Sequence, residues 1–341
     1  MEPSIYVPAY LERAYLAEHP ELTPAARDLL HDEVQLHPEH YATTDHARAL
    51  LSYQQVHDNL IRELDRMEDL TDEEFEERGG QLSQETRVEL HAIWRADDLC
   101  IDAQLVDIQL SDASLDSQLN DMMKLEQHAR SHLVRTAQGF DPELPGYWNA
   151  ALLPEGVSPA EATYTNPVAV GWLHTLEALS QTCIASARYR PACRYARMVM
   201  QAQGYPNRAV GTLLLALARL EDEDAFFEAA REGNCDTEDS PWFLLGRTLL
   251  LYKVGRRRNA QRALRDFATR CDGGAFFLLN PTFLTPYLPV RPEPREGWQL
   301  SHQAVWEADG IIVDTPDFAT WAASVDGISA LSERFAQRNG F

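Results

Sequence analysis

Hydrophobic and small residues recur at helical spacing along most of the chain. In the stretch "LHTLEALSQTCIASARYRPACRYARMV" (residues 173–199), Leu176 and Ser180 lie on one predicted helix, and Ala192 and Ala196 lie on the next. Residues three or four positions apart share a helical face, so this spacing predicts two amphipathic helices. Alternating strand patterns between Asn-Gly or Asp-Gly turns are nearly absent, and only "GIIVD" (310–314) fits either a short strand or a buried helical turn. The sequence therefore predicts an all-α fold.

Several hydroxyl-Pro pairs predict where helices begin, because the hydroxyl can cap the helix and proline fits the first helical position. Thr71 and Glu74 have the spacing of a capping box. The pairs are Thr23-Pro24, Ser158-Pro159, Ser240-Pro241, Thr285-Pro286 and Thr315-Pro316. The predicted helices span 8–18, 23–36, 43–67, 71–78, 83–96, 99–110, 114–137, 159–163, 166–186, 191–203, 207–220, 222–232, 240–254, 257–271, 299–308 and 316–336.

A charged segment, "MEDLTDEEFEERGGQLSQE", ends its acidic run at Gly79 and Gly80. Two adjacent glycines weaken a helix, so they predict a hinge. We therefore expect an N-terminal helical region over residues 1–80 and a helical repeat domain over residues 81–341.

The helix pair at 173–203 has the pattern of a tetratricopeptide repeat (TPR), a helix hairpin of about 34 residues. With Ala192 at the small position of the second helix, Ser180 falls at the small position of the first. Short side chains at both positions permit the two helix axes to approach to about 8 Å. The segments "NRAVGTLLLALARLEDEDAFFEAAREG" and "SPWFLLGRTLLLYKVGRRRNAQRALRDFATRC" fit two further hairpins, the second with a longer spacing. This succession predicts a TPR-like α-α superhelix, or solenoid.

An ordered series of motifs extends this pattern: "GYWNAALLPE", "YPNRAVGTLLLALARL", "PWFLLGRTLLLYKVG", "NPTFLTPYL" and "ADGIIVDTPDFATWAAS". The series resembles a family of degenerate TPR-like bacterial proteins related to the eukaryotic suppressor-of-tumorigenicity family, over residues 88–325. The resemblance implies a helical repeat fold and a binding or scaffold role without catalysis. The chain departs from the family at 207–210, where Asn-Arg-Ala-Val replaces a polar loop, so a shared ligand contact there is not implied.

Composition narrows the function classes. The 341 residues are 45% hydrophobic, which is typical of a folded protein, and 53 acidic residues outnumber 30 basic ones, for a net charge of -23. This charge disfavours nucleic-acid binding and favours a basic protein or peptide partner. The chain shows no signal peptide and no membrane span, and its five cysteines form no CxxC motif, so we expect a cytoplasmic protein with free thiols.

Binding is the expected chemistry, since the chain has no GxSxG, GxGxxG or Walker-type motif. In TPR-like stacks the first helix of each hairpin lines a concave groove where peptides bind. In this sequence, the groove positions are His174, Glu177, Gln181, Arg208 and Arg247. The sequence leaves open whether this groove is free or is covered by other helices of the chain.

Histidines concentrate near the N-terminus, where His37, His40 and His46 are weak metal-ligand candidates with Glu39 and Asp45 nearby. Pro38 is expected to keep the chain extended after His37, which would separate the ligands, so we predict no bound metal or other cofactor. Two alternatives to a non-catalytic scaffold or adaptor stay open. One is a metal-dependent enzyme or metal-binding module built on these histidines, and the other is a peptide-responsive regulator.

Overall fold

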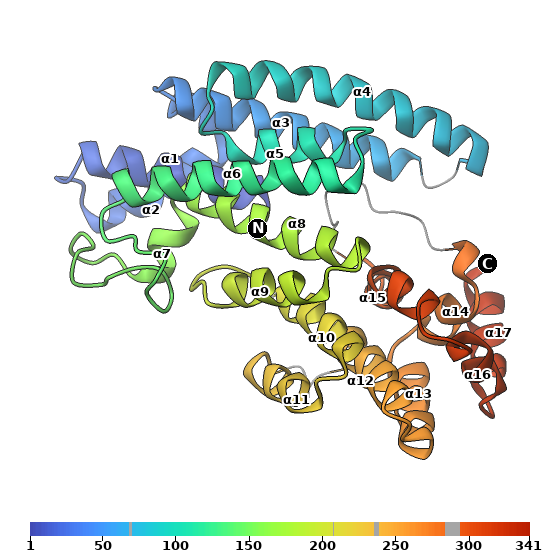
Figure 1. The fold of residues 1–341 in the computed structure, drawn as a ribbon. Helices are drawn as coiled ribbons and strands as arrows, with labels where there is room; N and C mark the ends of the chain where they lie inside the picture. Colours follow the sequence, from blue (N-terminus) through green and yellow to red (C-terminus); the bar gives the residue numbers. More distant parts are fainter. Residues whose placement is uncertain (68–69, 207, 235–238, 284–293) are drawn as a thin grey trace. The chain divides into compact units, whose positions relative to one another are not determined.

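The computed structural model describes residues 1–67, 70–206, 208–234, 239–283 and 294–341, and in these ranges its regular elements are helices (Figure 1). Within the described ranges, one isolated β-bridge joins Phe140 and Trp148. The predicted all-α fold is confirmed. None of the helices described here has a stretch long and apolar enough to cross a membrane.

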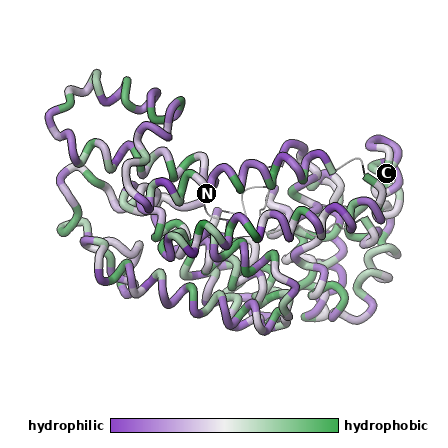
Figure 2. Tube along the Cα trace, turned by 90° about the horizontal axis from the view of Figure 1, so that it is seen from above, coloured by the Kyte–Doolittle hydropathy of each residue, from purple (hydrophilic) through white to green (hydrophobic). Residues whose placement is uncertain are grey.

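The chain forms two compact units. Unit 1 contains residues 1–178 and 201–206, and unit 2 contains residues 179–200 and 207–341. Helix α8 (Pro167–Ala185) contributes residues to both. In Figure 2, hydrophilic and hydrophobic residues alternate along the helices. This is the amphipathic pattern expected of helices that bury one face.

Unit 1 consists of α1–α7 and the first part of α8. Helix α1 packs against α2, α3 and α7, and α4 packs against α3 and α5. Helix α5 in turn packs against α6. The bounds are α1 (Pro3–Glu18), α2 (Pro24–Leu36), a 3-10 turn at Pro38–His40, α3 (Asp45–Arg66), α4 (Asp72–Ala96), α5 (Ile101–Gln109), α6 (Leu115–Thr136) and α7 (Pro159–Tyr164).

Unit 2 stacks hairpins beside a C-terminal helical group. Helix α10 packs against α9, α11 and α12, and α12 packs against α13. Helix α15 packs against both α10 and α12, while α14 packs against α17. The bounds are α9 (Tyr189–Met200), α10 (Ala209–Leu220), α11 (Glu223–Glu232), α12 (Pro241–Lys253), α13 (Arg257–Arg270), α14 (Gly274–Leu279), a 3-10 turn at Pro281–Phe283, α15 (Gly297–Val313), α16 (Phe318–Ser324) and α17 (Ile328–Asn339).

Most of the predicted helix starts are confirmed. The side chains of Thr23, Ser158 and Ser240 each accept a hydrogen bond from the backbone N–H three residues later. Thr71 forms the predicted capping box with Glu74. Thr315 was predicted wrongly, because its hydroxyl donates to the carbonyl of Ile311 at 2.7 Å and so belongs to the end of α15. Thr285-Pro286 lies outside the described residues.

Several predicted helix boundaries are wrong. Helix α4 continues through Gly79 and Gly80, so these residues do not interrupt it. The predicted helix at 316–336 is divided into α16 and α17 by a turn in which Gly327 has φ +88°. The "GIIVD" segment belongs to α15 and forms no strand.

The predicted close approach of two small residues occurs within unit 2. Ser180 and Ala192 are both fully buried, and the Ser180 hydroxyl donates to the carbonyl oxygen of Ala192 at 2.9 Å. A similar approach joins α10 and α12, where a Cβ added to Gly211 would lie 2.7 Å from Cγ of Trp242. Larger side chains at these positions would force the helices apart.

The described cysteines are free and buried. Burial raises the pKa of both Cys183 and Cys193 to about 11, so each thiol is protonated near neutral pH. Cys235 lies outside the described residues. The thiols therefore belong to the core, as the sequence predicted for free cysteines.

Candidate protein-interaction surface

The predicted groove residues of unit 1 are engaged in contacts within the unit. The Nδ1 atom of His174 lies 2.9 Å from Oδ1 of Asp102, which is only 4% exposed. The Tyr6 hydroxyl donates to Oδ2 of Asp102 at 2.6 Å. Glu177 accepts a hydrogen bond from the Tyr205 hydroxyl at 2.9 Å. His174 and Glu177 thus stabilise the packing of unit 1, and these bonds restrict their availability to a partner.

The other predicted groove residues, Gln181, Arg208 and Arg247, belong to unit 2 and are half-buried. Arg247 forms an ion pair with Asp266 on α13, and its guanidinium lies 5.5 Å from the centre of the Phe243 ring. The structure therefore describes the five residues in two separate units, and the single groove stays a prediction.

Helix α15 occupies a face of the two hairpin helices that would line such a groove in unit 2. Helix α10 is buried from Ala209 to Ala218. The indole N–H of Trp242, on α12, donates to Glu307 on α15 at 2.9 Å, and the Tyr252 hydroxyl donates to the carbonyl of Pro316. These contacts cover part of the face of α10 and α12 that would line a groove in unit 2.

Helix α2 carries two strongly exposed leucine side chains beside a depression in unit 1. Leu29 is 72% exposed and Leu36 is 71% exposed. Both line an open depression of about 460 Å³ between α2 and neighbouring residues of α1 and the following turn. The lining residues are Tyr15, Leu22, Ala26, Leu29, Leu30, Asp32, Glu33, Leu36 and Tyr41. We call these residues the α2 surface.

The sequence of α2 explains why two apolar faces form. Thr23 caps the helix, and Pro24 occupies its first position. Leu30 and Val34 are buried one turn apart, and α2 packs against α1. Leu29 and Leu36 lie seven positions apart, which is two helical turns, and therefore share a second face.

The α2 surface includes two exposed acidic residues, Asp32 and Glu33. Residues 21–40 contain five acidic side chains and one arginine, Arg27. This surface was not predicted from the sequence, because one apolar face is enough for a helix to pack and a second one was not sought. The spacing of Ala26, Leu29 and Leu36 could have indicated a second apolar face. This face is distinct from the one that contains the buried Leu30 and Val34.

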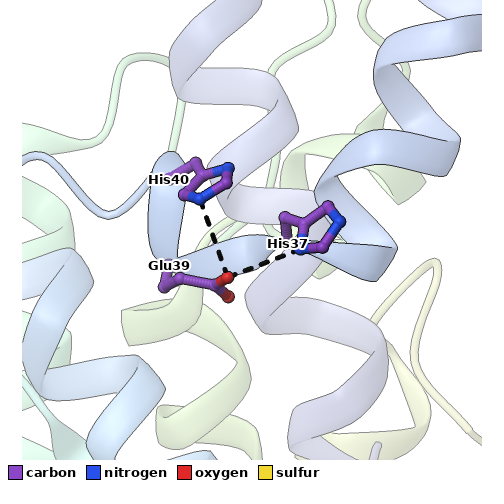
Figure 3. A group of neighbouring side chains, drawn as sticks. All are labelled: His37, Glu39 and His40. Atoms are coloured by element: carbon purple, nitrogen blue, oxygen red, sulfur yellow. Dashed lines mark ion pairs between the residues drawn. The ribbon is translucent and has the colours of Figure 1, made fainter.

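The prediction that Pro38 keeps the chain extended and separates the candidate metal ligands was wrong. Pro38 begins a 3-10 turn and does not extend the chain, and this turn brings His37 and His40 together with Glu39 (Figure 3). His46 is not part of this group, since its Nδ1 lies 2.5 Å from Oδ2 of Asp97.

Comparison of the chain with protein-family models, with curated proteins and with solved structures finds no match. The geometry of the surfaces described above is therefore the basis for inferring a function.

Proposed function

We propose that the protein is a non-catalytic scaffold or adaptor that binds another protein through the α2 surface. The observation that carries this proposal is the exposure of Leu29 and Leu36 on one face of α2, beside an open depression of about 460 Å³. Burial of leucine side chains exposed to this extent would stabilise a complex by roughly 1–2 kcal/mol each. Contiguous apolar surface with a polar rim is typical of interaction sites.

The partner that fits this surface is an amphipathic helix with basic flanking residues. Leu29 and Leu36 would contact its apolar face, in the way that helices bind in grooves. Asp32 and Glu33, which line the same depression, would attract its lysine or arginine side chains. The net charge of -23 would also increase the rate of encounter with a basic partner.

The proposal includes a TPR-like superhelix in the repeat region, related to the suppressor-of-tumorigenicity family that the sequence resembles. Support comes from the hairpin α12–α13 and from the bond between Ser180 and Ala192 at the predicted small positions.

A defined peptide tests the proposal. The probe is a fluorescently labelled helical peptide of leucine and lysine, and its binding is measured by fluorescence anisotropy. We expect saturable binding to the full-length protein, reduced at least about tenfold by the double substitution Leu29→Gln and Leu36→Gln, because this removes about 1.4 kcal/mol or more of apolar contact.

The matched control is Val88→Gln, because Val88 is 73% exposed on α4 and lies outside the α2 surface. Its affinity for the peptide should equal that of the wild type. A peptide of leucine and glutamate should bind more weakly than the basic one. Equal binding by the double variant and the wild type would contradict the assignment of the α2 surface.

A further inference from the structure

Three potential metal ligands lie together at the C-terminal end of α2. One atom from each of His37, Glu39 and His40 lies within 4.8 Å of the other two (Figure 3). The Nδ1 atom of His37 is 3.5 Å from Oε1 of Glu39, and Nε2 of His40 is 3.9 Å from the same oxygen. All three side chains are about half or more exposed, so an ion could reach them from solvent.

The backbone explains why the two imidazoles converge. Helix α2 ends with the N–H of His37 bonded to the carbonyl of Glu33, and Pro38 then begins the 3-10 turn. The N–H of His40 donates to the carbonyl of His37 at 3.1 Å. In a 3-10 turn, residues three apart are eclipsed. The rings of His37 and His40 accordingly stack, with their centres 5.2 Å apart.

The spacing suits a small coordination sphere. A tetrahedral zinc ion with bonds of about 2.0–2.1 Å separates its ligand atoms by about 3.3–3.4 Å. The distances of 3.5 and 3.9 Å from the Glu39 oxygen approach this value. Small rotations of exposed side chains would close the remaining difference. Two imidazoles and one carboxylate would leave the fourth position for water.

We propose that His37, Glu39 and His40 form a binding site for a divalent transition-metal ion of the zinc class. Imidazole ligands favour Zn²⁺, Cu²⁺ and Ni²⁺ over Mg²⁺ and Ca²⁺, which prefer oxygen ligands. The acidic surroundings on residues 21–40 attract cations. The site is separate from the proposed docking function, because none of its three ligands lines the α2 surface.

The test uses full-length protein without a polyhistidine tag, freed of metal by a chelator and then titrated with Zn²⁺ in a calorimeter. We expect one Zn²⁺ per chain. His37→Ala, His40→Ala and Glu39→Gln should each weaken this binding at least about tenfold, because each removes one of three ligands. Mg²⁺ at the same concentrations should not bind measurably. Circular dichroism should show that the helix content of the variants is unchanged.

The matched control is His31→Ala. His31 is also exposed and also has a carboxylate partner, Glu12 at 2.9 Å, but it does not belong to the group of three potential ligands. Its zinc affinity should equal that of the wild type. The proposal is overturned if the wild type binds no Zn²⁺, if all three ligand variants bind it as the wild type does, or if Mg²⁺ binds equally well.

Discussion

The carboxylate of Asp102 joins three helices of unit 1. It lies on α5, accepts a hydrogen bond from Tyr6 on α1 and pairs with His174 on α8. Burial would raise the pKa of Asp102, but the positive charge of His174 and the hydrogen bonds from His174 and Tyr6 outweigh it and lower the pKa. A buried carboxylate that is bonded to two partners fixes the arrangement of the helices that carry them.

Removal of this carboxylate should destabilise unit 1. We expect Asp102→Ala to lower the free energy of unfolding by about 3 kcal/mol, because the Tyr6 hydroxyl and the His174 imidazole would lose a buried partner. Chemical denaturation measures the change. The control is Asp98→Ala, since the Asp98 side chain is 75% exposed, and its effect should stay within about 0.5 kcal/mol. Similar losses for the two variants would contradict this account of Asp102.

His302 on α15 should make unit 2 sensitive to acid. Burial lowers its pKa from 6.5 to about 4. In the unfolded chain the imidazole takes up a proton below about pH 6.5, but in the folded chain it does so only below about pH 4. The folded state therefore loses stability as the pH falls across this window, by about 3 kcal/mol in all.

The measurement compares wild type with His302→Gln, which cannot titrate. The free energy of unfolding of the wild type should fall by about 3 kcal/mol more than that of the variant between pH 7 and pH 4. Parallel pH profiles would show that His302 is accessible to protons in the folded state.

The candidate site residues were only partly predictable at this scale. His37 and His40 were predicted as candidate metal ligands because they are close in sequence. His46 was predicted with them, and only the structure shows that it pairs with Asp97 instead. His174 was predicted as a groove residue because the repeat pattern assigns it to the groove face. Its partner Asp102 is distant in sequence, and no local pattern reports such a contact.

At the scale of elements, the packing of α8 against α9 within unit 2 depends on small side chains. Ala192 is fully buried, and its carbonyl accepts the Ser180 hydroxyl. We expect Ala192→Leu to lower the free energy of unfolding by about 1–3 kcal/mol, because the larger side chain cannot fit without displacing the helices. The change is measured by thermal or chemical denaturation.

The control for this substitution is Ala330→Leu on α17, where the alanine is exposed. There the change should be within about 0.5 kcal/mol. If Ala192→Leu is tolerated equally well, the close approach at the predicted small positions does not determine the packing of these helices.

Helices were predictable where their ends have a local cause. The Thr23, Ser158 and Ser240 caps involve residues three positions apart, which a sequence pattern can report. In α4, tertiary packing outweighed the local signal. Helix α4 continues through Gly79 and Gly80, because α3 and α5 pack along it and offset the low helix propensity of glycine. The break before Gly327 was missed because the pattern around it is apolar at helical spacing.

For the whole molecule, the all-α class followed from the hydrophobic period, but the division into units did not. Residues 201–206 belong to unit 1 although their neighbours on both sides belong to unit 2. This assignment depends on contacts between residues that are far apart in sequence, which a local pattern does not report. The net charge of -23 belongs to the entire chain. The α2 surface has acidic residues of its own, Asp32 and Glu33, next to exposed leucines.

The central claim is that the α2 surface is a docking site, and the most direct measurement is amide hydrogen exchange of the full-length protein with and without the leucine–lysine peptide. The account predicts that the bound peptide slows exchange in α1 and α2, around the depression lined by Leu29 and Leu36. Exchange in α4, around Val88, should not change. Protection confined to unit 2, or no protection of α2 at saturating peptide, would contradict the account.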